Sequence, residues 1–277
     1  MSGSKKANII FLDVDGTLVA EDSKVPDSAR RACIEARRNG HILCVATGRQ
    51  YQVIGADILS IGFDGIISAG GARVDAEGKT IFNAAFNSAV LSRIIDYFES
   101  RGAGCTFERA DCLVASERVF EQFRCLDPEY YKLVEELYIK NENVVEGALD
   151  PNFPDVAKVI FCGVPGLSFE EIRAEFAGEC EVFKGSMPFY GKGNGELCPA
   201  GVNKGSAVDL LLRYFGKEKE DAVAIGDGEN DLPMFRRCGI GIAMGNGDAS
   251  LKKAADFITG SVSAGGLAQA FVRYGLI

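Results

Sequence analysis

Residues 8–17 have the sequence Asn-Ile-Ile-Phe-Leu-Asp-Val-Asp-Gly-Thr, in which a short apolar run ends at two acids and a glycine. Such a run predicts a buried β-strand, and Gly16 predicts where it ends. Strand side chains alternate with a period of two, so we expect Asp13 and Asp15 to face the same pocket. The stretch therefore predicts a buried strand with a pair of carboxylates at its carboxyl end.

The next segments alternate between helix and strand patterns. Predicted helices cover residues 26–39 and 51–61, predicted strands cover residues 41–46 and 65–69, and a hairpin follows at residues 73–82. A β-α-β-α-β order predicts a parallel sheet with helices on both faces. The fold class is thus α/β, with a Rossmann-like core domain.

The pattern changes at residue 83, where short strands mix with helices, and the first pattern returns with a predicted helix at residues 203–215. We therefore expect a core domain built from residues 1–82 and 196–277, with an α+β domain inserted at residues 83–195. The glycine-rich segment 191–195 predicts a hinge at the second crossing between the domains.

Composition excludes several classes of protein. The chain has 277 residues and a net charge of -9, which argues against nucleic acid as a partner because a phosphate backbone requires a basic face. No apolar stretch approaches the roughly 18 residues of a membrane span, and residues 1–8 are polar, so we expect a cytoplasmic protein without signal peptide or membrane contact. The nine cysteines form no C-x-x-C pair, which favours reduced thiols.

Histidine chemistry is improbable. The one histidine, His41, opens a predicted strand. This argues against Ser-His-Asp and Cys-His mechanisms and against a histidine-rich metal site.

Four polar clusters follow predicted strands or open predicted helices. They are Asp13-Val14-Asp15-Gly16-Thr17, Thr47-Gly48-Arg49, Asn203-Lys204-Gly205 and Gly226-Asp227-Gly228-Glu229-Asn230-Asp231. In an open parallel sheet, ligands bind outside the carboxyl ends of the strands. We therefore expect the four clusters to meet at that edge.

The chemistry of these clusters fits a metal ion and a phosphate. Four carboxylates (Asp13, Asp15, Asp227 and Asp231) are tolerable together only with a cation between them or with raised pKa values. Hard oxygen ligands favour Mg²⁺. A cation at Lys204, the hydroxyl of Thr47 and the backbone N–H of Gly48 are the parts of a phosphate cradle.

The order of residues suggests roles. Asp13 attacks phosphorus to give an aspartyl phosphate, and Asp15 gives a proton to the leaving oxygen and later takes one from water. Mg²⁺ and Lys204 neutralise charge on the transferring group.

The four motifs, in this order and spacing, resemble those of the haloacid dehalogenase superfamily, in its Cof-type sugar-phosphatase branch, along essentially the whole chain. The insert resembles the type IIB cap domain of that branch. The resemblance implies that Asp13 is nucleophile and metal ligand, and that Asp15 is general acid/base and binds metal through its backbone carbonyl. It further implies that Thr47 and Lys204 hold phosphate, Asp227 binds metal, Asp231 supports the metal site, and Asn230 lies near the phosphate.

Two segments depart from the family pattern. Residues 68–72 are Ser-Ala-Gly-Gly-Ala, where Asn-Gly-Ala is common, and residues 265–267 are Gly-Gly-Leu, where Asp-Gly-Val is frequent. The first departure bears on substrate contacts, and neither touches the four motifs.

Alternatives remain open at this stage. Lys204 could be a solvated surface lysine, Asp231 could cap its helix, and Arg49 could contact substrate or form a structural ion pair. The same residues could serve a Mg²⁺-dependent phosphatase for small phosphomonoesters, a phosphomutase, or a non-catalytic phospho-aspartate switch. For the phosphatase, the expected partner is a small phosphorylated metabolite, and the expected state is a monomer or weak homodimer.

Overall fold

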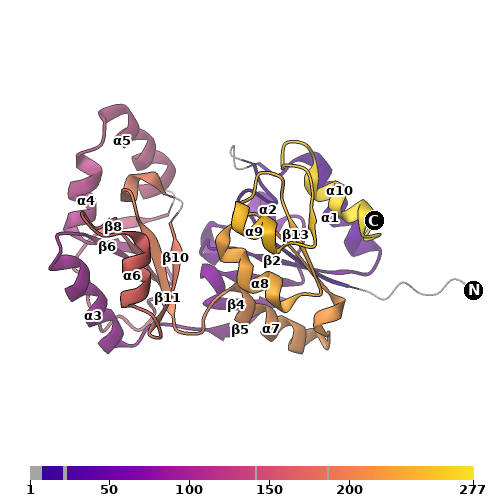
Figure 1. The fold of residues 1–277 in the computed structure, drawn as a ribbon, viewed down its shortest axis with the longest axis horizontal. Coiled ribbons are helices and arrows are strands. Elements are labelled where there is room, and N and C mark those ends of the chain that lie inside the picture. Colours follow the sequence, from indigo (N-terminus) through magenta and orange to yellow (C-terminus); the bar gives the residue numbers. More distant parts are fainter. Residues whose placement is uncertain (1–7, 21–23, 141, 186) are drawn as a thin grey trace, which may run out of the picture. The chain divides into compact units, whose positions relative to one another are not determined.

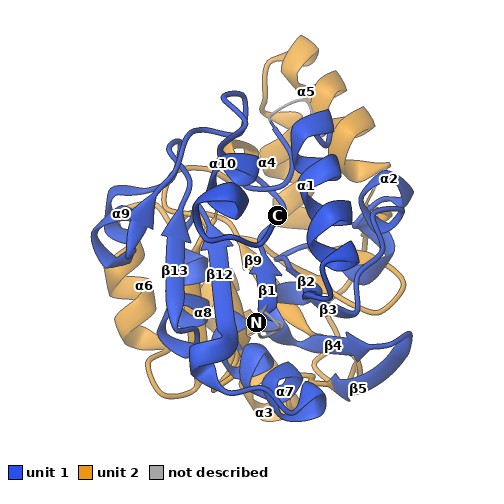
Figure 2. Ribbon diagram, turned by 90° about the vertical axis from the view of Figure 1, so that its right-hand side faces the viewer, with its two compact units in different colours: residues 1–82, 203–277 blue, residues 83–202 orange. Residues whose placement is uncertain are grey.

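The structure is a computed structural model that describes residues 8–20, 24–140, 142–185 and 187–277. The chain forms two compact units, which are coloured separately in Figure 2. Unit 1 contains the described residues up to Phe82 together with Asn203–Ile277, and unit 2 contains Asn83–Val202. Of the polar amino-terminal stretch, residues 1–8, residues 1–7 lie outside the described part of the chain.

Unit 1 is an α/β unit around an eight-stranded sheet, with its elements labelled in Figure 1. Its strands are β1 (Ile9–Leu12), β2 (Ile42–Ala46), β3 (Gly65–Ser68), β4 (Arg73–Ala76), β5 (Lys79–Asn83), β12 (Ala222–Gly226), β13 (Ile240–Ala243) and β14 (Phe257–Ile258). Its α-helices are α1 (Asp27–Arg38), α2 (Ala56–Leu59), α7 (Lys204–Phe215), α8 (Leu232–Arg237), α9 (Ala249–Ala254) and α10 (Gly266–Arg273).

The strand order is β14-β13-β12-β1-β2-β3-β4-β5, so β1 lies between β12 and β2. Strands β14 to β3 in this order are parallel, and β4 is antiparallel to β3. Alternate residues of β1 enter different cores: Ile10 packs in the cluster with α1 and α10, and Phe11 packs in the cluster with α7 and α8. Burial on both faces explains why the strand is apolar throughout.

Unit 2 is an α+β unit around a six-stranded sheet of order β10-β11-β9-β6-β7-β8. Its strands are β6 (Cys105–Glu108), β7 (Leu113–Ala115), β8 (Val144–Glu146), β9 (Lys158–Phe161), β10 (Cys180–Lys184) and β11 (Gly195–Pro199). Its α-helices are α3 (Ser88–Glu99), α4 (Glu117–Arg124), α5 (Pro128–Val134) and α6 (Phe169–Glu175). Stacked rings of Phe98, Phe161 and Phe176 join α3 and the end of α6 to β9.

Three details differ from the sequence expectation. Strand β11 pairs with β9 and β10, so the chain returns to unit 1 after Val202, later than the expected boundary at residues 195/196. The helix expected at residues 51–61 is a short 3₁₀ helix, η1 (Tyr51–Val53), followed by α2, because Gly55 has φ of 88° and interrupts the helical backbone. The sequence analysis also did not identify β8, β11, β14 and α10.

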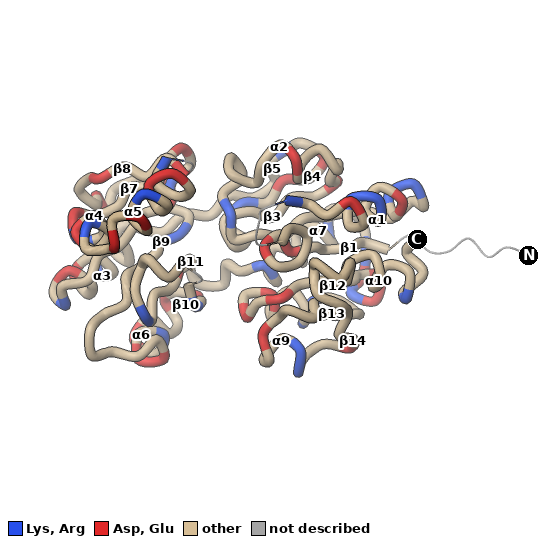
Figure 3. The backbone as a smooth tube through the Cα atoms, turned by 90° about the horizontal axis from the view of Figure 1, so that it is seen from above, with Lys and Arg blue, Asp and Glu red and all other residues tan. Residues whose placement is uncertain are grey.

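Charge and polarity are distributed over both units. Acidic and basic residues intersperse along each of them (Figure 3). His41 is buried before β2, where its Nδ1 accepts the N–H of Asn8 at 3.0 Å, which is a structural role. No helix in the described ranges combines the length and apolar character that crossing a membrane requires.

Candidate active site

Three of the four motifs lie at the carboxyl ends of neighbouring parallel strands. Asp13 follows β1, Thr47 follows β2, and Asp227 follows β12, and these strands lie side by side. The backbone N–H of Asp13 donates to the carbonyl of Ile225 at 3.0 Å, which continues the β1–β12 pairing to the edge. The carboxyl edge of the sheet therefore gathers segments that are far apart in the sequence.

Lys204 joins this edge from the first turn of α7. Its Nζ donates to Asp13 Oδ1 at 2.6 Å and to Asp231 Oδ1 at 2.7 Å, and the side chain is 1% exposed. The helix begins firmly here because the side chain of Asn203 accepts the N–H groups of Gly205 and Ser206. The alternative of a solvated surface lysine is therefore wrong.

Asp231 uses both carboxylate oxygens inside the protein. Oδ1 accepts from Lys204, and Oδ2 accepts the backbone N–H groups of Asp227 at 3.0 Å and Gly228 at 3.1 Å. A Cβ at Gly226 would overlap Oδ2 of Asp231, which explains the glycine there. Asp231 makes no side-chain cap to α8, so its role is to fix the loop after β12 and the position of Lys204.

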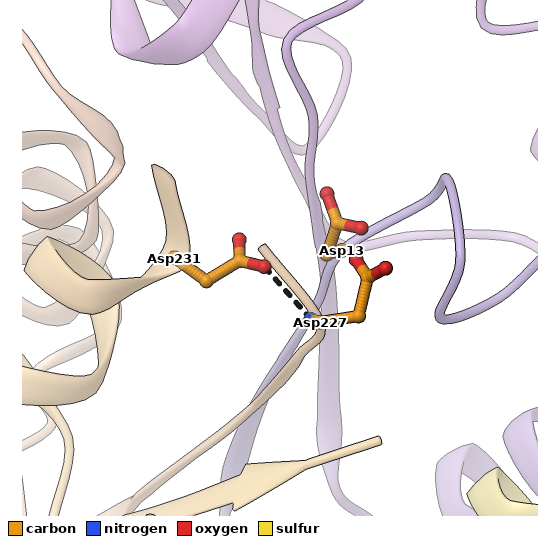
Figure 4. A group of neighbouring side chains, drawn as sticks. All are labelled: Asp13, Asp227 and Asp231. Carbon is orange, nitrogen blue, oxygen red and sulfur yellow. Dashed lines mark hydrogen bonds between the residues drawn. The ribbon is translucent and has the colours of Figure 1, made fainter. Parts of the chain in front are cut away.

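Asp227 brings a third carboxylate to the same place. One oxygen from each of Asp13, Asp227 and Asp231 lies within 4.8 Å of the others. Figure 4 shows these three side chains and the segments that carry them. Gly16 has φ of 78°, and a Cβ there would overlap the carboxylate of Asp227. Glycine in the first motif therefore allows the loop after β1 to lie directly against Asp227.

The electrostatics of the cluster indicate a deficit of positive charge. Burial raises the pKa of Asp13 well above its ordinary value; Lys204 opposes the rise, and Asp231 and Asp227 add to it. Burial, together with the charge of Asp231, raises the pKa of Asp227 to about 7. Burial alone would lower the pKa of Lys204, but Asp13 and Asp231 outweigh it, so this pKa is raised and the side chain is an ammonium.

The donor set therefore fits a divalent cation. Three carboxylates share one ammonium group, so two of them must either hold a proton or meet a further cation. Carboxylate oxygens suit Mg²⁺. Asp13 forms a hydrogen bond through Oδ1, and its Oδ2 forms none within the described part of the chain.

The side chain of Asp15 is not among these three clustered carboxylates, but burial raises the pKa of Asp227 and the charge of Asp15 is close enough to add to that rise. Its carboxylate is 59% exposed and accepts two hydrogen bonds from Arg49, from Nε at 3.0 Å and from Nη2 at 2.5 Å. Asp15 does not join the cluster because the strand ends at Leu12, so the period of two no longer applies at Asp15.

Thr47 and Asn230 lie at the same edge of the sheet, in the segments that follow β2 and β12. Thr47 is 1% exposed, and its Oγ1 accepts the backbone N–H of Arg49 at 3.1 Å. The following Gly48 does not open an α-helix, because η1 begins three residues later. Asn230 lies half-buried in a 3₁₀ turn, η6 (Glu229–Asp231).

Asn246 is a site residue that the sequence analysis missed. Its Nδ2 donates to the carbonyl of Gly16 at 2.8 Å and lies 3.5 Å from Asp227 Oδ2, and its Oδ1 accepts the N–H of Val262 at 3.1 Å. It thus ties the loop after β1 to Asp227. The rule that ligand sites follow parallel strands could have found it, because Asn246 comes just after β13.

Known proteins resemble this chain in sequence and in fold. The family model of the haloacid dehalogenase-like hydrolases matches residues 10–271. The provisionally named phosphatase YkrA of Bacillus subtilis (strain 168) is 25% identical over 98% of this chain and 99% of its own. The 5-amino-6-(5-phospho-D-ribitylamino)uracil phosphatase YitU of the same organism is 25% identical over 97% of this chain and 98% of its own.

Among solved structures, the subclass IIB sugar phosphatase BT4131 superposes with a TM-score of 0.79 at 23% identity. The match covers 98% of this chain and 100% of BT4131. At this identity the likeness shows the fold alone. It extends through both units, including the inserted one.

Proposed function

The chain belongs to the haloacid dehalogenase-like hydrolases, and from this premise we propose that it is a Mg²⁺-dependent phosphatase for small phosphomonoesters, sugar phosphates among them, with Asp13 as nucleophile. The observation that carries the proposal is the buried carboxylate of Asp13, held by Lys204 beside Asp227 at the carboxyl edge of β1 and β12. The names of YitU and BT4131, which act on a phosphorylated ribityl compound and on sugar phosphates, support a small sugar-like substrate.

The residues would divide the work as follows. Oδ2 of Asp13 forms a bond to phosphorus while the bond from phosphorus to the bridging oxygen breaks and its electron pair stays on that oxygen. Asp15 gives its proton to the bridging oxygen, which leaves as an alcohol. Water then attacks phosphorus, gives its proton to Asp15, and releases phosphate and the carboxylate of Asp13.

Lys204 and the metal supply the positive charge that this transfer requires. Asp13, Asp227 and the backbone carbonyl of Asp15 would hold Mg²⁺, with Asp231 as support, and the bound ion neutralises charge on the phosphoryl oxygens. Lys204 holds Oδ1 of Asp13, which leaves Oδ2 to react. Thr47, Gly48 and Asn230 would bind the phosphoryl oxygens.

The test is release of inorganic phosphate from sugar phosphates and p-nitrophenyl phosphate with Mg²⁺. Asp13→Asn should abolish turnover while the far-UV circular dichroism spectrum stays unchanged. Full activity of this variant, or of the wild type in excess chelator, would contradict the proposal. An isomerised sugar phosphate in place of inorganic phosphate would identify a mutase, and a stable phosphoprotein without multiple turnover would identify a switch.

A further inference from the structure

The ion pair between Arg49 and Asp15 is bidentate and therefore orients the carboxylate of Asp15. Nε and Nη2 of Arg49 each donate to a different oxygen of Asp15, at 3.0 and 2.5 Å. Two parallel bonds of this kind fix the direction of a carboxylate as well as its place. Without them, a side chain that is 59% exposed would sample several rotamers.

Arg49 is itself held by the edge of the sheet. Its backbone N–H donates to Thr47 Oγ1 at 3.1 Å, and its carbonyl accepts the N–H of Ala69 at 2.7 Å. Ala69 has φ of 48° and opens the loop that departs from the family pattern, and the next residue, Gly70, donates to the carbonyl of Thr47 at 3.0 Å. These bonds hold the backbone of Arg49 at the ends of β2 and β3, and Nη1 of its guanidinium lies 3.5 Å from the carbonyl oxygen of Val53.

Stability is a poor explanation for this arrangement. An ion pair whose carboxylate is more than half exposed contributes little to folding, because water and salt screen it. A role in proton transfer explains the ion pair better, because the rate of proton transfer depends steeply on the position of the oxygen that gives or takes the proton.

We propose that Arg49 is the positioning residue for Asp15, holding its carboxylate where it exchanges a proton with the bridging oxygen of the substrate. The inference rests on the proposed function, since Asp15 acts as acid and base there. Arg49 then matters most when the leaving group cannot depart without a proton. A residue that binds the phosphoryl group directly would matter equally for every phosphomonoester.

The test compares kcat/KM for p-nitrophenyl phosphate, phenyl phosphate and glucose 6-phosphate, whose leaving groups increase in basicity. The value of kcat/KM depends only on the steps up to departure of the leaving group. The later hydrolysis of the aspartyl phosphate therefore does not affect it. Arg49→Gln should lower kcat/KM for the most basic leaving group by about 10²-fold or more, the usual size of an acid–base contribution, and for p-nitrophenyl phosphate by much less. Arg49→Lys should recover part of the loss.

The matched control is Arg73→Gln, which removes another bidentate pair of unit 1, from Arg73 Nε and Nη2 to Asp75 at 2.8 and 3.0 Å. This control variant should change kcat/KM by the same factor for all three substrates. In an Asp15→Asn background, Arg49→Gln should add no further dependence on the leaving group, because both changes remove one function.

Three results would overturn the inference. Equal losses on all three esters would make Arg49 a phosphate-binding residue, and no loss would make its ion pair structural. A dependence on the leaving group that persists in the Asp15→Asn background would show that Arg49 does not act through Asp15. If the wild type hydrolyses none of the esters, the proposed function itself fails instead.

Discussion

Replacing Lys204 by methionine tests the electrostatic core of the site, because the side chain keeps its approximate length and loses its charge. Lys204 is 1% exposed and contacts Asp13 and Asp231 at 2.6 and 2.7 Å. With an effective dielectric constant of about 20, Coulomb's law gives each contact about 6 kcal/mol of gross attraction. Desolvation of the buried ions, at several kcal/mol each, offsets much of this.

The variant leaves buried carboxylates without their cation. We expect Lys204→Met to lower the free energy of unfolding of the metal-free protein by about 3–5 kcal/mol, the usual cost of removing one partner of a buried ion pair. We expect Mg²⁺ to restore part of the loss, because it supplies positive charge to Asp13 and Asp227. Turnover should fall by about 10²-fold or more, as when one preorganised donor is removed.

The assay is urea unfolding followed by far-UV circular dichroism, since the chain has no tryptophan to report by fluorescence. Lys253→Met is the control, because Lys253 is exposed on α9 in the same unit, and a surface change of this kind should alter stability by less than about 0.5 kcal/mol. If Lys204→Met is no more destabilising than Lys253→Met, the buried ion cluster does not have the energetic role argued from its geometry.

Two other changes probe the metal-binding side of the cluster. Asn246→Ala should weaken Mg²⁺ binding by about 10-fold, because Asn246 joins Gly16 to Asp227 and loss of such an outer-shell partner has an effect of this size. Isothermal titration calorimetry measures the affinity for Mg²⁺. An unchanged affinity would exclude this role of Asn246. The raised pKa of Asp227 means that the folded state holds this proton more tightly than the unfolded state, so its stabilising contribution is present at low pH and is lost as pH rises through about 7. Urea midpoints of the metal-free protein should therefore fall between about pH 4 and about pH 7, and Mg²⁺ should reduce the fall. A pH-independent difference between the two series would refute this reading.

The sequence by itself determined the α/β class, the split of the core around an insert, and the motifs that meet at the sheet edge. Apolar runs that end at Asp13 and at Gly226 are local signals, because burial on both faces of a parallel strand requires a continuous apolar run. The meeting of these motifs followed from a rule about strand ends. The structure places Asp13, Lys204, Asp227 and Asp231 together, as that rule predicted.

Only the tertiary structure decided how the carboxylates are distributed. Asp15 accepts hydrogen bonds from Arg49 and does not join the cluster of Asp13, Asp227 and Asp231, because the turn after Leu12 ends the strand periodicity on which the expectation depended. Oδ2 of Asp231 accepts hydrogen bonds from backbone N–H groups of the loop after β12, and Oδ1 accepts one from Lys204. These choices depend on contacts between segments far apart in the chain, and no periodicity within a single segment encodes them.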